Sequence, residues 1–199
     1  MFESEIAKYQ SLNKLASQHG TVILGGTDDL SIPLGELKQA FALEGDLYNR
    51  SMPDLTVSLS AEVFDACIKA LNPETVLLHI GAADLKSFGE NSSAFDQAYR
   101  DLIGRIRAVN RKCRIAVISL RNPEERTDIA ELNKHLKYLA DAERCEYSDI
   151  TVKRIWNPKE TKEVMSFLYS TGFVRPLNVK RPLYDLVKIL FCYDPACIA

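Results

Sequence analysis

The run Thr75–Ile80 (TVLLHI) is the feature of this sequence that most restricts its fold. It is short for a helix, and it is apolar at both odd and even positions, as a strand is when both faces of its sheet are covered. Arg114–Leu120 (RIAVISL) has the same character, and Thr21–Leu24 is a shorter apolar run that ends at Gly25-Gly26. Three such runs predict a parallel sheet that is buried on both sides.

Segments with apolar residues at helical spacing separate these runs. We expect helices over residues 3–19, 34–41, 60–71, 93–110, 128–144, 161–170 and 182–191, and weaker strands over residues 46–49 and 146–150. Gly20 is expected to end the first helix beside His19, and Ser60 to cap the third. This alternation predicts an α/β protein: a three-layer α/β/α sandwich with a central parallel sheet of about five strands. Residues 1–199 should form one domain, with residues 1–20 as a helix packed on it.

Composition and charge exclude several classes of partner. The net charge is −2 and no block of like charge occurs, so we expect no nucleic-acid partner. No apolar run is long enough to span a bilayer, and the start MFESEIAKYQ lacks a signal peptide's basic and apolar regions, so we expect a cytoplasmic protein without membrane contact. The five cysteines are odd in number and irregularly spaced, which argues against a disulfide framework or a zinc site. We expect no metal and no cofactor.

The carboxyl ends of the predicted strands are where a ligand should bind, because ligands of open parallel sheets lie beyond that edge. The segments that follow the strands are Gly25–Asp29, Asn49–Asp54, Gly81–Asp84 and the loop before the last helix. These four segments therefore define the candidate site.

The same four segments resemble the conserved blocks of the SGNH/GDSL hydrolases. Ile23-Leu24-Gly25-Gly26-Thr27 is similar to the family's apolar-apolar-G-D-S, Asn49-Arg50-Ser51-Met52-Pro53-Asp54 to N-R-G-x-x-G, Gly81-Ala82-Ala83-Asp84 to G-x-N-D, and Thr171-Gly172-Phe173-Val174 to D-x-x-H. The similarity covers roughly residues 21–191 in order and spacing. It implies the flavodoxin-like SGNH hydrolase fold.

The resemblance also implies that the catalytic groups have been replaced. In the family a serine attacks an ester carbonyl, a histidine removes its proton, and an aspartate orients that histidine. The degenerate positions are Thr27 for the serine, Ser51 and Asp54 for two glycines, Ala83 for the asparagine that stabilises the oxyanion, and Thr171 and Val174 for the aspartate and histidine. Thr27 keeps a hydroxyl, whereas Ala83 has no donor and Asp54 brings negative charge to a place where negative charge must develop.

Other residues are candidates to replace the lost groups. His79 lies near the end of the central strand on the face opposite to Val76, Leu78 and Ile80, so it is either a neutral histidine bonded within the core or a group that reaches the Thr27 hydroxyl. His19 and His135 are expected to be a helix-terminal and a solvated histidine. Asp28, Asp29, Asp54 and Asp84 are expected to converge on one rim, without a metal. The candidate pocket comprises Gly26, Thr27, Asp28, Asn49, Asp54, His79, Gly81 and Asp84.

Three functions stay open from the sequence. The first is an inactive hydrolase-like module whose pocket binds a small molecule or carbohydrate, or whose surface binds a protein partner. The second is a divergent acyl esterase or carbohydrate deacetylase that uses Thr27, with His79 or an unrecognised group as its base. The third is a structural or assembly protein that keeps the fold as a scaffold. The oligomeric state does not follow from the sequence.

Overall fold

A sheet of five parallel strands forms the centre of the computed structural model, which describes residues 2–122, 124–151 and 183–191. The strands are β1 (Thr21–Gly25), β2 (Leu47–Asn49), β3 (Thr75–His79), β4 (Arg114–Ile118) and β5 (Glu146–Ser148). Their order is β2-β1-β3-β4-β5, the flavodoxin-like order, in which the chain reverses its direction of travel between β1 and β3. The predicted fold class is confirmed.

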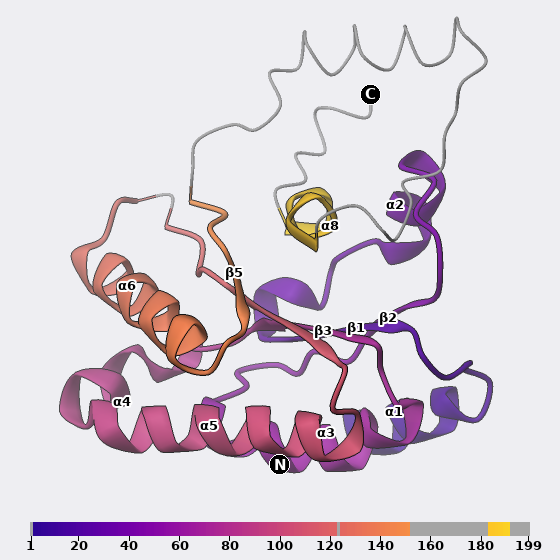
Figure 1. Cartoon of the computed structure of the whole chain (residues 1–199), viewed down its shortest axis with the longest axis horizontal. Coiled ribbons are helices and arrows are strands. Elements are labelled where there is room, and N and C mark those ends of the chain that lie inside the picture. The colour runs from indigo at the N-terminus through magenta and orange to yellow at the C-terminus, as the bar shows by residue number, and fades with distance from the viewer. Residues whose placement is uncertain (1, 123, 152–182, 192–199) are drawn as a thin grey trace, which may run out of the picture.

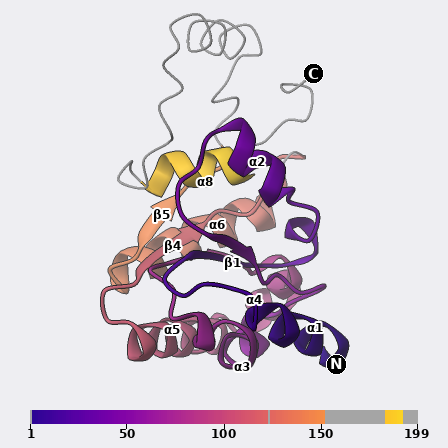
Figure 2. The same ribbon diagram turned by 90° about the vertical axis from the view of Figure 1, so that its right-hand side faces the viewer.

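Helices cover both faces of the sheet (Figures 1 and 2). One face carries α1 (Glu3–Asn13), α3 (Val57–Cys67), α4 (Leu85–Glu90), α5 (Ser92–Val109) and α6 (Thr127–Ala142). The other carries α2 (Leu34–Ala40) and α8 (Leu183–Phe191). Because right-handed crossovers place helices on both sides of a parallel sheet, β1 and β3 are buried along their whole length.

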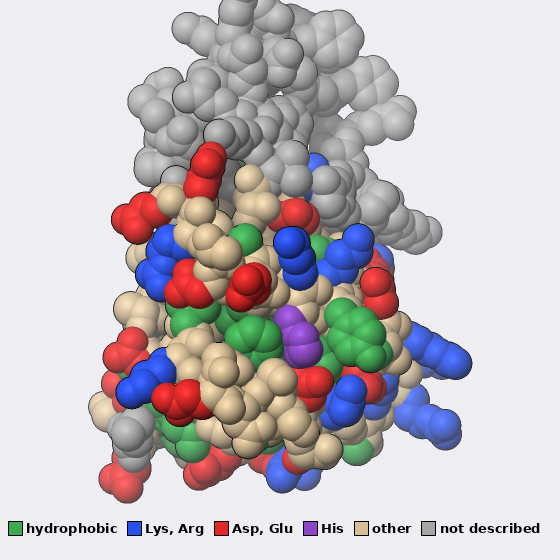
Figure 3. Space-filling model, turned by 90° about the vertical axis from the view of Figure 1, so that its left-hand side faces the viewer, with side chains coloured by type: hydrophobic (Ala, Val, Ile, Leu, Met, Phe, Trp, Pro, Cys, Tyr) green, Lys and Arg blue, Asp and Glu red, His purple; other side chains and the backbone are tan. Residues whose placement is uncertain are grey.

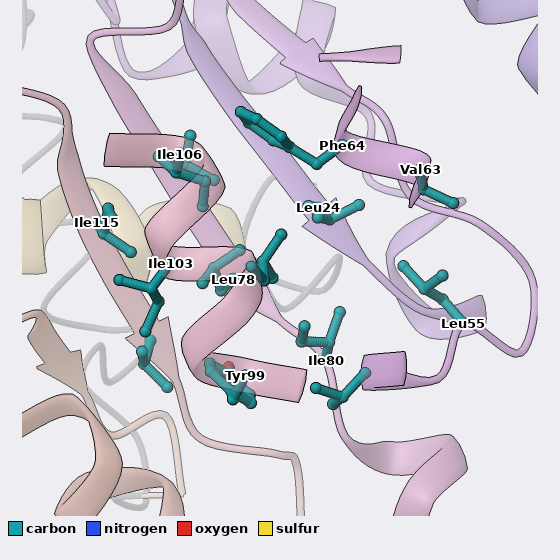
Figure 4. Packing of buried hydrophobic residues seen from close by; sticks show 14 of the residues in the cluster. Leu24, Leu55, Val63, Phe64, Leu78, Ile80, Tyr99, Ile103, Ile106 and Ile115 are labelled. Atoms are coloured by element: carbon teal, nitrogen blue, oxygen red, sulfur yellow. The ribbon is translucent and has the colours of Figure 1, made fainter. Parts of the chain in front are cut away.

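Alternate residues of the strands face two different hydrophobic clusters, one on each side of the sheet. Val22 and Val76 face the α3–α5 side, whereas Ile23 and Leu77, their neighbours in sequence and partners in register, face α2 and α8. Figure 4 shows the larger cluster, in which Phe64 and Leu24 pack together. Each fully buried aliphatic or aromatic side chain contributes about 1.5–3 kcal/mol through burial. The sheet can therefore carry polar groups only at its edges and strand ends.

Some predicted helix boundaries were wrong. The first helix ends at Asn13 rather than near Gly20, and His19 lies outside it with a positive φ of 68° and its N–H bonded to the Leu71 carbonyl. The third helix begins at Val57, so Ser60 does not cap it; the Ser60 hydroxyl donates to the Val57 carbonyl from inside the helix. Local periodicity does not detect the long-range contacts that fix such ends.

The remaining boundaries agree within a few residues. The helix predicted from residue 93 starts at Ser92, where the Asn91 side chain accepts from the Ala94 N–H as a cap. The short helix α4 was not predicted, because six residues carry too little periodicity. The helix predicted over residues 161–170 lies outside the described residues. None of the described helices is long and apolar enough to cross a membrane.

Candidate functional site

The chain after β2 runs along the end of β1 and so brings two of the similar blocks together. The Arg50 N–H donates to the Ile23 carbonyl at 2.9 Å, and the Met52 N–H donates to the Gly25 carbonyl at 3.1 Å. These bonds continue the ladder between the strands past their ends. As a result, the loop that contains Asp54 lies directly beside the turn Thr27–Asp29, a short 3₁₀ helix.

Thr27 and Asp54 are bonded to each other in both directions. The Thr27 hydroxyl donates to Asp54 Oδ1 at 3.0 Å, and the Asp54 backbone N–H donates to Thr27 Oγ1 at 2.9 Å. Both residues are exposed. Asp54 adopts a left-handed backbone with φ of 49°, a conformation that favours glycine, the residue of the similar family block. The hydroxyl after the first strand therefore faces a carboxylate and the N–H of the same residue.

Two backbone N–H groups near the turn already have partners. The Ser51 N–H donates to Asn49 Oδ1 at 3.0 Å, and the Gly26 N–H donates to Asp29 Oδ2 at 3.0 Å. The Ser51 side chain is buried, and its hydroxyl has no partner among the described residues. Ala83 is exposed and contributes a methyl group where the similar block has an amide. An oxyanion would find few free donors in this arrangement.

Asp29 and His79 form a buried pair on the other side of the turn. His79 Nδ1 lies 2.7 Å from Asp29 Oδ1, with side chains 4% and 2% exposed. The Asp29 carbonyl accepts from Asn49 Nδ2 at 2.6 Å, which ties the turn to β2 as well. No hydrogen bond among the described residues joins His79 to Thr27. The interpretation of His79 as a histidine bonded within the core is therefore the one that the geometry matches.

Gly25 is required by this pair. A Cβ on Gly25 would lie 1.8 Å from Asp29 Oδ2 and 2.5 Å from Asp29 Cγ, so no other residue fits without displacing the carboxylate. The second glycine, Gly26, has open space at the corresponding position. The first glycine of the block thus serves the Asp29–His79 pair rather than the approach of a ligand.

Asp84 supports the start of α3. Its Oδ2 accepts from the Val57 N–H at 3.0 Å, and burial raises the pKa of its carboxyl while this backbone hydrogen bond lowers it. Gly81, at the end of β3, has φ of 124°, which other residues rarely adopt. The predicted convergence of four aspartates on one rim was wrong: Asp29 and Asp84 point into separate buried contacts, and only Asp28 and Asp54 are exposed.

A polar cluster from α1, missed by the sequence analysis, holds the loop in place. Arg50 is 5% exposed; its Nε and Nη2 donate to Asn13 Oδ1, and its guanidinium lies 5.1 and 5.4 Å from the ring centroids of Tyr9 and Tyr48. The Tyr9 hydroxyl donates to the Ser51 carbonyl at 2.7 Å. Burial lowers the pKa of Arg50 and raises that of Tyr9. The sequence around Tyr9 and Asn13 does not indicate this contact, because the helix is only weakly amphipathic.

His135 and the three cysteines among the described residues form no hydrogen bond with Thr27 or Asp54. His135 Nε2 lies 2.5 Å from Asp96 Oδ1, and its ring contacts Phe88 and Tyr138; this histidine is partly exposed, as a solvated histidine is, but is also paired with a carboxylate. Figure 3 shows histidine, acidic and hydrophobic side chains together at the surface on this side of the molecule. Burial raises the pKa of Cys67 to about 11, of Cys145 to about 11 and of Cys113 to about 12, which keeps these thiols protonated at neutral pH.

The structure thus unites part of the predicted site. Gly26, Thr27, Asp28, Asn49, Ser51 and Asp54 lie on the adjoining β1 and β2 loops, and Gly81, Ala83 and Asp84 follow β3. Thr171 and Val174, predicted to replace the acid and base of the last block, lie outside the described residues. Among the described residues, no group of three or more histidine, cysteine, aspartate or glutamate side chains is arranged to hold a metal ion.

The fold is that of known hydrolases. A candidate platelet activating factor from Streptococcus pneumonia is 20% identical with a TM-score of 0.64, covering 75% of this chain and 74% of that one. A GDSL-like lipase from Bacteroides thetaiotaomicron is 15% identical with a TM-score of 0.55 over 84% of this chain and 96% of that one. The acetyl xylan esterase AlAXEase is 13% identical with a TM-score of 0.56 over 86% and 95%. No family model and no curated protein matches the sequence. These likenesses establish the SGNH hydrolase fold.

Proposed function

We propose that this SGNH hydrolase-like protein does not cleave esters by the serine mechanism and acts instead by binding a ligand beside Thr27. The observation that carries the proposal is the reciprocal hydrogen bonding between Thr27 and Asp54. A nucleophilic hydroxyl needs a base that takes its proton and donors that stabilise the oxyanion. The Thr27 hydroxyl is bonded to the Asp54 carboxylate, whereas the imidazole of His79 is bonded to Asp29.

The known rate effects of losing such groups support the proposed loss of hydrolysis. Removing a single oxyanion donor lowers the rate on the order of 10²–10³-fold. Here Ala83 supplies no side-chain amide, the Ser51 N–H is bonded to Asn49, and the negative charge of Asp54 lies beside the Thr27 hydroxyl, where it opposes a developing oxyanion. The β-methyl of Thr27 also restricts the rotamer that an attack would need. Groups of this kind act together, so the losses are not summed, but each works against the ester transition state.

The same contact favours one alternative, an esterase in which Asp54 is the base. Asp54 Oδ1 accepts the Thr27 hydroxyl proton at 3.0 Å, which is hydrogen-bonding reach for general-base catalysis. In model peptides a carboxyl has a pKa of about 3.9 against about 6.5 for imidazole, so it is the weaker proton acceptor. This alternative predicts a slow activity that depends on both residues.

The ligand proposed for the rim is a small molecule or carbohydrate with hydroxyl groups. Asp28 and Asp54 are exposed carboxylates, and no salt bridge among the described residues neutralises them. Carboxylates and the Thr27 oxygen accept hydrogen bonds from sugar hydroxyls. A protein partner, or a purely structural role in an assembly, are the competing proposals; a monomer in light scattering would argue against the assembly role.

Turnover of a panel of esters tests the proposal. Wild-type protein, Thr27→Ala and Asp54→Asn would be assayed with p-nitrophenyl acetate, p-nitrophenyl butyrate and an acetylated xylo-oligosaccharide, beside an active esterase as assay control. We expect all three forms to match the buffer background. Turnover by the wild type that falls at least tenfold in both variants would establish the alternative with Asp54 as base.

A binding measurement tests the second part of the proposal, that a ligand binds beside Thr27. Backbone NMR of the wild-type protein would be followed during titration with xylo-oligosaccharides and with neutral polyols. We expect shifts confined to Thr27, Asp28 and Asp54, and weaker binding in Asp54→Asn. Shifts spread over helices far from this edge, or none across the panel, would remove the proposed hydroxyl-bearing ligand.

A further inference from the structure

His79 leaves half of its imidazole without a hydrogen bond inside the protein. Nδ1 is bonded to Asp29, whereas Nε2 is buried and has no partner among the described residues. Buried polar atoms are almost always paired, since an unpaired one loses its hydration without compensation. An apolar residue would fill this position of β3 without that cost, so the histidine itself requires an explanation.

The hydrogen bonds of Asp29 assign the state of the ring. Asp29 Oδ2 accepts from the Gly26 N–H, and Oδ1 faces His79 Nδ1 at 2.7 Å, so the carboxylate is the acceptor and Nδ1 carries the proton. A proton on Nε2 as well would leave a buried charged donor unpaired. Nε2 is therefore a hydrogen-bond acceptor, held in orientation by Asp29.

An aromatic ring covers this imidazole. The Phe191 ring meets the His79 ring edge-on, with 4.9 Å between centroids and 65° between planes. Phe191 is the last residue of α8 and is 2% exposed. Its carbonyl accepts from Arg121 Nη2 at 2.8 Å, and Arg121 follows β4. The cover is thus one side chain at a helix end, held by the apolar packing of α8 on the sheet and by this hydrogen bond.

We propose that the Asp29–His79 pair is a second binding site, closed by Phe191, for a small aromatic molecule that carries a hydroxyl group. The ring of such a ligand takes the place of the Phe191 ring, and its hydroxyl donates to His79 Nε2. The surroundings select against charge, because the neighbouring side chains of this face are Ile23, Leu77 and Ile118. The site lies on the opposite side of the turn from Thr27 and does not depend on the function proposed there.

Phenol and toluene are a matched pair of probes, because they share a ring and differ in the donor. Calorimetric titration of the full-length Phe191→Ala variant should show phenol binding at least tenfold more tightly than toluene. In Phe191→Ala/His79→Lys the preference should vanish, because the lysine ammonium can still donate to Asp29 but carries no hydrogen-bond acceptor. The control is Phe64→Ala, which opens a cavity in the other hydrophobic cluster, where phenol should have no advantage. Equal affinities in Phe191→Ala would overturn the proposal.

A second measurement decides the matter if Phe191→Ala fails to fold. Arg121→Gln removes the hydrogen bond from the guanidinium to the Phe191 carbonyl and leaves the Phe191 ring in place. With ¹⁵N-labelled histidine, added phenol should move the Nε2 resonance of His79 in this variant more than in the wild type, while His135 stays unchanged as the internal reference. An unaffected His79 resonance at saturating phenol would contradict the proposed site.

Discussion

The turn Thr27–Asp29 takes part in two aspartate partnerships that differ in nearly every respect. Thr27 and Asp54 meet at the surface, and the second of them has a strained, left-handed backbone. Asp29 and His79 meet in the interior, where both side chains are at most 4% exposed. A hydroxyl, a histidine and a carboxylate are therefore all present at the end of β1, but the histidine–carboxylate pair and the hydroxyl are divided between two sides of one turn.

This division shows that a hydroxyl, a histidine and a carboxylate at one strand end do not by themselves form a catalytic triad, which also needs a specific geometry. A triad needs the imidazole between the carboxylate and the hydroxyl. Here the imidazole is bonded to the carboxylate and packs against Phe191, while the hydroxyl bonds to a different carboxylate. The buried pair contributes to the structure of the turn, and the exposed pair lies at the positions where we propose that the catalytic groups have been replaced.

The largest difference should appear when each carboxylate is removed. Asp29→Ala leaves the Gly26 N–H and His79 Nδ1 unpaired in the interior, and we expect a loss of about 3–5 kcal/mol in the free energy of unfolding. Asp54→Ala, its exposed counterpart, should change that free energy by less than about 1 kcal/mol. Urea unfolding followed by circular dichroism measures both. Similar losses in the two variants would break the comparison.

Gly25→Ala should give the next largest effect. The added Cβ overlaps Asp29 Oδ2, so the carboxylate has to leave His79, and we expect a loss of about 2–3 kcal/mol. Gly26→Ala is the matched control, because nothing lies within 4 Å of the corresponding Cβ. Thermal unfolding of the two variants side by side checks the prediction, and a Gly25→Ala variant as stable as the control would show that the buried pair tolerates displacement.

Asp84 adds a third aspartate whose burial has a pH signature. Its pKa is raised in the folded state, so its contribution to stability is present in full below the ordinary pKa of an aspartate and is lost as pH rises through the raised folded value. Asp84→Asn keeps an acceptor for the Val57 N–H and does not ionise. We expect the variant to gain up to about 1 kcal/mol over the wild type at pH 7 and none at pH 3. Urea unfolding at both pH values measures this; a variant that is less stable at pH 7 would contradict the assigned cause.

The smallest effect concerns the strain of the exposed pair. Left-handed backbone costs roughly 1–2 kcal/mol for a residue with a Cβ, and glycine loses about 0.5–1 kcal/mol more entropy on folding. We therefore expect Asp54→Gly to raise the free energy of unfolding by about 0.5 kcal/mol, although it removes the bond to Thr27. Asp54→Asn, which retains the Cβ, should show no such gain in the same denaturation series.

The layers of the fold could be predicted because buried parallel strands leave a strong local signal. TVLLHI and RIAVISL are apolar at consecutive positions, and that pattern alone indicated cover on both faces. The placement of His79 opposite Val76 and Leu78 followed from the period of a strand and agrees with the structure.

The partners of the site residues could not be predicted, since they depend on contacts between distant segments. Nothing in the sequence near Asp29 indicates His79, fifty positions away, and nothing near Asn13 indicates that Arg50 would end up against it. The predicted end of α1 was wrong for the same reason. The Asn13 side chain accepts a hydrogen bond from Arg50 and donates one to the Cys67 carbonyl, and both partners are distant in sequence. Composition and periodicity carry no information on such pairings.

Covalent trapping of the Thr27 hydroxyl tests the central claim most directly. Wild-type protein and Thr27→Ala would be incubated with an alkyl fluorophosphonate, which forms a stable adduct with an activated serine or threonine hydroxyl, and analysed by intact-mass and peptide mass spectrometry. With a carboxylate instead of an imidazole at Thr27, we predict unmodified protein in both cases after hours of exposure. A stoichiometric adduct on the peptide containing Thr27, absent from Thr27→Ala, would contradict the account.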